Sequence, residues 1–418
     1  MKKLLVYLKD YKKESILGPL FKLLEASFEL IVPLVVASMI DVGIAQGDKG
    51  YVGRMCLIMA ALGLIGLVCS ITAQYFAAKA AVGFATKLRH GVFEHIQKLS
   101  FSQLDREGTA TLITRITSDI NQVQSGVNLV LRLFLRSPFI VFGAMVMAFT
   151  VDVKAALIFV VVIPVLSVIV FGIMLVSIPL YKRVQSGLDR VLGTTRENLT
   201  GVRVIRAFGQ EPAEISKFDG ENDALKKIQT TAGRISALMN PLTYVVINAG
   251  LIALIYTGAL QVDAGVLSKG EVVALINYMS QILVELVKLA NLIITMTKAV
   301  ACGNRIEAVL AMPAGLKEYS AGKLDEAASV NTGSEEETGS VVFEHVGLRY
   351  YEGGEEALTD ITFKARKGDT IGIIGGTGSG KSSLVNLIPR FYDVTSGSVR
   401  ADGRDVRSYD TVALRDKI

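Results

Sequence analysis

Six segments of this 418-residue chain are apolar over about 20 residues, the length at which an α-helix crosses the hydrocarbon core of a bilayer. Hydrophobic residues make up 51% of the chain and charged residues only 20%, a composition that excludes intrinsic disorder and is unusual for a water-soluble protein. The sequence therefore predicts a membrane protein with six spans, near 17–42, 55–78, 134–150, 155–180, 241–262 and 271–297.

The N-terminal segment is basic but lacks the compact apolar stretch and small-residue cleavage site of a removable signal peptide. Its periodic pattern favours an amphipathic helix on the membrane surface, with a solvated tail as the alternative. Cys56, Cys69 and Cys302 show no CxxC spacing and no neighbouring His, so we interpret them as core or lipid-facing thiols rather than metal ligands.

Lysine and arginine are unevenly divided among the connections. Residues 1–13, 79–136 and 181–236 hold 23 of them, whereas the other three connections between spans hold four. Because basic residues stay on the cytoplasmic side, both termini and the two long loops are predicted to be cytoplasmic. This orientation explains the basic excess of the chain, so no nucleic-acid partner is predicted.

The third and fourth spans are joined only by residues 151–154, which predicts an antiparallel helical hairpin with a very short outer turn. Arg132 and Arg136 lie at the inner end of the short third span, where we expect their side chains to snorkel toward water.

The two long inner loops have helical periodicity and few Gly or Pro residues, so they are predicted to extend the helices into the cytosol. Each contains a polar break, at 102–108 and 208–214. Either break could form a short transverse helix on which a soluble domain docks, or a plain turn between two helices.

Charged residues also occur within the first and sixth spans. Lys22, Glu25 and Glu29 share one helix face, and Glu285 and Lys288 share another. Glu29 and Glu285 could contact a polar or cationic cargo. The favoured interpretation is that Lys22 and Lys288 pair with the nearby carboxylates.

Composition changes after about residue 310. Residues 311–340 are small, polar and acidic, which indicates a solvated linker. Beyond it, strand-like patterns at 341–343, 358–363 and 370–374 predict a soluble domain over residues 341–418, following a membrane domain over residues 1–310.

A glycine-rich motif follows the last of these predicted strands. It has the pattern GxxxxGK[ST] between a strand and an apolar helix, the setting in which backbone N–H groups converge on phosphate oxygens. Lys381 would reach the β- and γ-phosphates of a nucleotide, and the Ser382 hydroxyl would bind Mg²⁺. The predicted nucleotide-binding residues are Gly375, Gly376, Thr377, Gly378, Ser379, Gly380, Lys381, Ser382 and Ser383.

Six spans, two long helical loops, a linker and this motif together resemble an ATP-binding-cassette (ABC) exporter half-transporter of the bacterial multidrug or lipid type. The resemblance covers essentially the whole chain and is most specific over the motif and residues 386–393 and 396–399; residues 112–120 and 201–208 resemble segments beside the family's two coupling helices. It implies an all-α six-helix transmembrane domain with long cytosolic helical extensions, followed by an α/β P-loop nucleotide-binding domain. The resemblance also implies that the loop tips dock on nucleotide domains. It further implies that Tyr350 stacks on adenine, with the neighbouring Tyr351 as the alternative.

The match to the family is partial at the C-terminal end. The Gln-containing loop, signature motif, Mg²⁺-binding aspartate with its catalytic carboxylate, and switch histidine of the family do not occur in residues 384–418. An apolar strand such as 371–374 is normally buried in a parallel sheet covered on both faces, and little chain follows to supply that sheet. We therefore expect an incomplete nucleotide-binding domain, a truncated or fragmentary transporter, and no catalytic residue within the chain.

The main hypothesis is an ATP-driven exporter subunit in a bacterial plasma membrane, working with a second half-transporter chain, identical or different, on a small hydrophobic or amphipathic substrate. The alternative is a non-hydrolysing membrane subunit that binds nucleotide weakly or not at all. A membrane-tethered P-loop kinase or GTPase does not explain the long helical loops.

Overall fold

The computed structural model describes residues 2–313, 315, 340–351 and 353–418. The predicted linker lies largely outside these residues. The chain divides into two compact units, one formed by residues 1–5, 85–121 and 302–418 and the other by residues 6–84 and 122–301.

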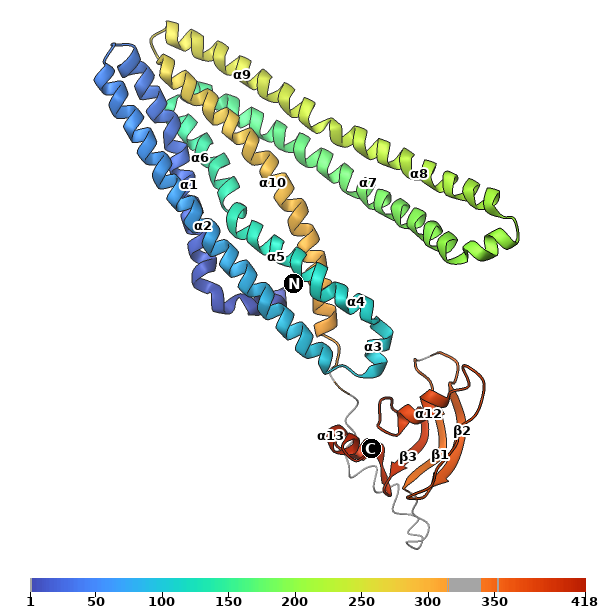
Figure 1. Ribbon diagram of the computed structural model, residues 1–418. Coiled ribbons are helices and arrows are strands. Elements are labelled where there is room, and N and C mark those ends of the chain that lie inside the picture. Colours follow the sequence, from blue (N-terminus) through green and yellow to red (C-terminus); the bar gives the residue numbers. More distant parts are fainter. Residues whose placement is uncertain (1, 314, 316–339, 352) are drawn as a thin grey trace. The chain divides into compact units, whose positions relative to one another are not determined.

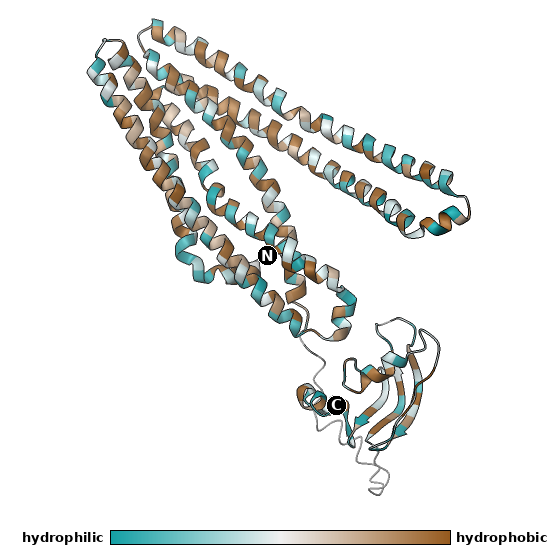
Figure 2. Ribbon diagram, in the orientation of Figure 1, coloured by the Kyte–Doolittle hydropathy of each residue, from teal (hydrophilic) through white to brown (hydrophobic). Residues whose placement is uncertain are grey.

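Long helices make up most of the chain (Figure 1). Within the described residues, six helical stretches are long and apolar enough to cross a membrane, and each contains one of the predicted spans. In Figure 2 the apolar colour runs along α1, α2 and the first part of α7, whereas α8 carries much hydrophilic colour. The principal elements are η1 (Lys2–Tyr11), α1 (Lys12–Ser38), η2 (Met39–Ile44), α2 (Lys49–Gln97), α5 (Ile120–Leu129), η4 (Val130–Phe134), α6 (Arg136–Val151), α7 (Val153–Ala207), α8 (Glu211–Ala237), α9 (Met239–Asp263) and α10 (Lys269–Leu310).

The hairpin between the third and fourth spans is confirmed. Helix α6 ends at Val151 and α7 begins at Val153, which leaves only Asp152 in extended conformation between them. The Asp152 carboxylate accepts a 2.6 Å hydrogen bond from the backbone N–H of Ala155 and caps α7. A side chain from α9 supports this turn, because Gln261 Nε2 donates to Asp152 Oδ1 at 3.1 Å.

The unit formed by residues 6–84 and 122–301, called the helical unit below, has its core among α1, α6, α7, α9 and α10. Phe159, Leu254, Tyr278 and Ile282 are all fully buried there. The Tyr278 hydroxyl donates a 2.7 Å hydrogen bond to the backbone carbonyl of Leu30, which satisfies the one polar atom of this buried ring. The sixth span is thereby joined to the first.

Charged side chains within the spans are partly as expected. Lys22 pairs with Glu25, and Lys288 Nζ lies 2.9 Å from Glu285 Oε1, which confirms the predicted pairs. The prediction that Arg136 snorkels toward water is wrong. Its side chain is only 7% exposed and bonds to both Glu29 and Glu285, so opposite charge inside the unit replaces hydration.

The two polar breaks fold differently. The first forms the short helix α3 (Phe101–Glu107), in which the Ser100 hydroxyl accepts from Gln103 N and the Gln103 side chain accepts from Ser100 N. The second is a plain turn, because α7 ends at Ala207 and α8 begins at Glu211. Each of the two alternatives left open by the sequence therefore occurs once, a short helix at the first break and a plain turn at the second.

A small antiparallel sheet follows the helices. Its strand order is β2-β1-β3-β4, with β1 (Val341–Leu348) central and paired to β2 (Leu358–Ala365) and β3 (Ser396–Ala401); β4 (Arg404–Asp405) is at the edge. Phe343 of β1 stacks on Phe363 of β2, with ring centroids 4.6 Å apart. Helices α12 (Lys381–Leu387) and α13 (Thr411–Arg415) contribute Leu384, Leu387 and Leu414 to the same core.

The predicted strand at 370–374 is wrong. These residues have no regular structure and pair with no strand in the described part of the chain. Ile374 is 96% exposed as a result. A strand forms only when a neighbour takes up its backbone hydrogen bonds, and the antiparallel sheet offers these residues none. The nucleotide-binding fold is accordingly incomplete, as expected.

Candidate functional site

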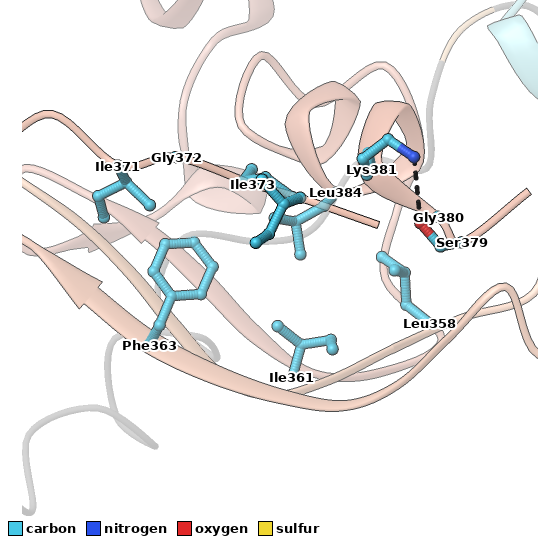
Figure 3. A pocket seen from close by; sticks show the side chains of 11 residues that line it. Leu358, Ile361, Phe363, Ile371, Gly372, Ile373, Ser379, Gly380, Lys381 and Leu384 are labelled. Carbon is cyan, nitrogen blue, oxygen red and sulfur yellow. Dashed lines mark hydrogen bonds between the residues drawn. The ribbon is translucent and has the colours of Figure 1, made fainter. Parts of the chain in front are cut away.

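The glycine-rich loop turns sharply into α12, and its backbone geometry explains why glycine is needed (Figure 3). Gly378 and Gly380 have φ of +85° and +83°, a region that other residues adopt only with strain. A Cβ atom on Gly380 would also lie 2.7 Å from the backbone oxygen of Ala357 and from a methyl group of Leu358. The loop thus needs glycine both for its conformation and for its close approach to β2.

Lys381 is the first residue of α12, and its side chain folds back over the loop. Its ammonium group donates to the backbone carbonyls of Gly375 and Gly376 at 2.9 Å and 2.6 Å, and to the Ser379 hydroxyl at 3.2 Å. The Lys381 ammonium group therefore lies against the loop backbone, where it could contact an anion bound by the loop. Loop and lysine together fit the requirements of a polyphosphate site.

The two serines after Lys381 are placed differently. Ser382 is exposed, so its hydroxyl can reach a ligand or metal ion. Ser383 is 9% exposed, and its hydroxyl forms a 2.6 Å hydrogen bond with the Tyr350 hydroxyl. Tyr350 is thus brought to the start of α12, while the neighbouring Tyr351 is 70% exposed.

A pocket of about 400 Å³ lies between β2, the segment before the loop, and α12. Figure 3 shows Phe363 and Ile361 of β2 facing Ile373 and Leu384 across it. Ser379, Gly380 and Lys381 of the loop line the same pocket, so the polar part of its wall lies at the loop and the rest is largely apolar. The apolar side chains of β2 and α12 border this pocket because residues 371–374 form no strand that would pack closely against them.

Helix α3 contacts the nucleotide-binding region through an aromatic cluster. The Phe101 ring packs on Phe391 and Tyr392, at centroid distances of 4.6 Å and 6.3 Å. The Tyr392 hydroxyl donates a 2.6 Å hydrogen bond to Asp105 Oδ2 of α3. Two causes raise the pKa of Tyr392 to about 12: burial has the larger effect, and the hydrogen bond to the Asp105 carboxylate the next largest.

Tyr392 also connects this cluster to the loop. Its ring packs edge-on against Tyr350 at a centroid distance of 5.0 Å, and Tyr350 in turn bonds Ser383. A continuous path of contacts therefore runs from α3 to the first turn of α12. No local sequence pattern indicates a role for Tyr392 or Asp105, since their partners are distant along the chain.

The geometry defines a multi-span membrane protein with a glycine-rich loop at the start of α12. Comparison with known families agrees with a membrane protein: residues 15–286 match the ABC transporter transmembrane region, and residues 358–418 match the ABC transporter family. The chain belongs to the ABC transporter family.

Three relatives illustrate the extent of this similarity. An uncharacterized ABC transporter ATP-binding protein of Mycobacterium tuberculosis is 35% identical over 98% of this chain and 69% of its own length. A second such protein, from Bacillus subtilis, is 31% identical over 100% of this chain and 71% of its own length. A multidrug efflux ATP-binding/permease protein of Mycobacterium bovis is 26% identical over 98% of this chain and 34% of its own length.

Proposed function

We propose that the chain is a subunit of an ATP-driven exporter and that residues 375–383 form its ATP-binding loop. The observation that carries this proposal is the Lys381 ammonium group, held by the carbonyls of Gly375 and Gly376 on a loop whose conformation needs glycine at positions 378 and 380. A triphosphate would exchange these carbonyl contacts for stronger contacts between the ammonium group and phosphate oxygens.

The other predicted residues take complementary roles. Backbone N–H groups from Gly375 to Lys381 face the phosphates, the exposed Ser382 hydroxyl is the proposed Mg²⁺ ligand, and Tyr350 stacks on adenine. When bound, Mg²⁺ would neutralise phosphate charge. Ser383 has an indirect role, because its hydroxyl is hydrogen-bonded to the Tyr350 hydroxyl and so fixes the position of the Tyr350 ring.

The proposal extends to the assembly. Two chains, identical or different, would work together in a bacterial plasma membrane with both termini cytoplasmic, as the distribution of basic residues supports. Residues 1–310 would be the membrane domain, 311–340 the linker and 341–418 the nucleotide-binding part. The multidrug efflux relative supports a small hydrophobic or amphipathic substrate.

Contacts of α3 suggest how nucleotide binding could reach the membrane domain. Movement of Tyr350 on adenine would be passed to Tyr392, and from there to Phe101 and Asp105. The proposed path consists of packed rings and one hydrogen bond to a carboxylate.

A second candidate function is a subunit that binds nucleotide weakly and does not hydrolyse it. The unpaired segment before the loop favours this candidate, because Ile371, Ile373 and Ile374 are 45%, 40% and 96% exposed and no strand holds the loop in place from that side.

Binding of a fluorescent ATP analogue to the purified chain, with Mg²⁺ and a parallel assay of phosphate release, distinguishes the candidates. The Lys381→Ala variant is compared with wild type, and Lys367→Ala serves as the control because Lys367 is an exposed turn residue outside the loop. We expect Lys381→Ala to lower affinity at least about tenfold, since charge-assisted contacts to phosphate are lost.

Each outcome has a definite meaning. Binding with phosphate release supports the first function, and binding without release supports the second. Equal affinity in wild type and Lys381→Ala would reject residues 375–383 as the nucleotide site.

A further inference from the structure

A second pocket, of about 350 Å³, lies in the helical unit between α1 and α10. Its wall combines apolar side chains, including Val32, Val36 and Val284, with polar and charged ones. Two of the charged residues, Glu29 of α1 and Lys288 of α10, are 42% and 44% exposed. The pocket therefore presents one anionic and one cationic group beside an apolar surface.

These two groups are the ends of a chain of four alternating charges. Glu29 Oε2 bonds Arg136 Nη2 at 2.6 Å, Arg136 Nη1 bonds Glu285 Oε1 at 2.6 Å, and Lys288 Nζ bonds the same Glu285 oxygen at 2.9 Å. The two inner members are buried, at 7% exposure for Arg136 and 3% for Glu285. The Ser137 hydroxyl donates to the second Glu285 oxygen at 2.8 Å, so the carboxylate of Glu285 is satisfied.

Glu29 and Lys288, at the two ends of this series of charges, form fewer hydrogen bonds than Arg136 and Glu285 at its centre. Among the described residues, Glu29 is bonded through its Oε2 to Arg136, and Lys288 uses one of its ammonium donors on Glu285. A carboxylate oxygen and further ammonium donors therefore remain for a ligand in the pocket.

Charge balance selects the kind of ligand. Two carboxylates and two basic groups give the chain of charges a net charge of zero, and a ligand with a single charge would add an uncompensated charge within the spans. A ligand with one positive and one negative group leaves the net charge at zero. Its positive group can pair with Glu29 and its negative group with Lys288.

We propose that this pocket binds zwitterionic amphiphiles, with the ligand ammonium group on Glu29, its anionic group on Lys288 and its alkyl chain along the valine surface. The assignment rests on the proposed exporter function insofar as it names the substrate class, but binding itself requires no nucleotide.

Lipid retention by the full chain tests this proposal. The purified protein is incubated without ATP with lysophosphatidylethanolamine, which is zwitterionic, and separately with lysophosphatidylglycerol and an alkylamine of the same chain length. Bound molecules are counted by native mass spectrometry. We expect the zwitterionic lysolipid to bind about tenfold more tightly than either singly charged probe.

Two substitutions test the roles of Glu29 and Lys288 separately. Glu29→Gln should abolish the preference over lysophosphatidylglycerol, and Lys288→Met should abolish the preference over the alkylamine. Asp223→Asn and Lys226→Met are matched controls, because they remove an exposed ion pair of α8 that lies outside this pocket. Both controls should keep the wild-type preference.

Several results would overturn the proposal. These are equal binding of the three probes, tightest binding of the alkylamine, or an unchanged preference in both pocket variants that melt at the wild-type temperature. Glycerophosphoethanolamine, the same headgroup without a chain, should bind poorly, and equal retention of it would overturn the assignment to an amphiphile. Because ATP is absent, failure here leaves the Lys381 measurement unaffected.

Discussion

Arg136 Nη1 donates a 2.6 Å hydrogen bond to Glu285 Oε1, which joins the first residue of α6 to the middle of α10. The same guanidinium bonds Glu29 of α1 through its other terminal nitrogen. One arginine thus connects three predicted spans, and it does so with an exposure of only 7%. Its positive charge is balanced by carboxylates rather than by water.

The first prediction concerns this arginine. Arg136→Met should lower the free energy of unfolding by about 3–5 kcal/mol, because Glu285 is then buried with a large part of its compensating charge removed. A thiol-reactive dye monitors unfolding as the buried Cys69 and Cys302 become accessible, above the signal that the exposed Cys56 gives in the folded state. The exposed Arg183, changed to Met, is the control.

Adding Glu285→Gln to Arg136→Met should recover part of the lost stability, since the unpaired carboxylate is then removed. A double variant that melts below both single variants would contradict the assignment of the loss to an uncompensated charge.

The second prediction concerns Tyr392. Tyr392→Phe should remove the bond to Asp105 and lower stability by about 1 kcal/mol, the ordinary net value of a hydrogen bond. Ring packing on Phe101 is retained in this variant. Thermal melting measures the change, and Tyr351→Phe, at an exposed tyrosine, should have no effect.

A pH dependence follows from the same contact. The folded-state pKa of Tyr392 is raised to about 12 from an ordinary value of 10.0, so its stabilising contribution is complete below about pH 10 and is lost as pH rises toward 12. A spectrophotometric titration of phenolate, wild type minus Tyr392→Phe, should show one tyrosine ionising near 12. A difference curve centred at 10 would contradict this.

The third prediction concerns the loop backbone. Gly380→Ala should weaken nucleotide binding at least about tenfold, because the new Cβ meets Ala357 and the left-handed conformation costs about 1–2 kcal/mol in other residues. Gly372→Ala is the control, since a Cβ there meets nothing within 4 Å. Binding of the fluorescent ATP analogue provides the measurement, and equal weakening by both variants would contradict the explanation.

The fourth prediction concerns the turn between α6 and α7. Asp152→Ala should lower stability by about 1–2 kcal/mol, because it removes both the N-cap bond to Ala155 and the bond from Gln261. Asp152→Ser should retain most of it, because a serine hydroxyl can accept the same bond. If Ser and Ala variants melt together, the cap is not the source of the stability.

Local patterns in the sequence predicted the features that depend on near neighbours. The six spans follow from apolar length alone, and the pairs Lys22 with Glu25 and Glu285 with Lys288 follow from a spacing of three residues on a helix. The turn at Asp152 was equally local. The roles proposed for Lys381 and Ser382 come from the loop motif and await the binding measurements.

Tertiary structure decided the features that join distant parts of the chain. Arg136 was expected to reach water, but it finds Glu29 and Glu285, which are 107 and 149 residues away, so no local pattern could reveal the pairing. The segment 371–374 has the composition of a strand, yet it stays unpaired. Helix formation is satisfied within a segment, whereas a strand and a buried charge both need partners that only the folded chain can supply.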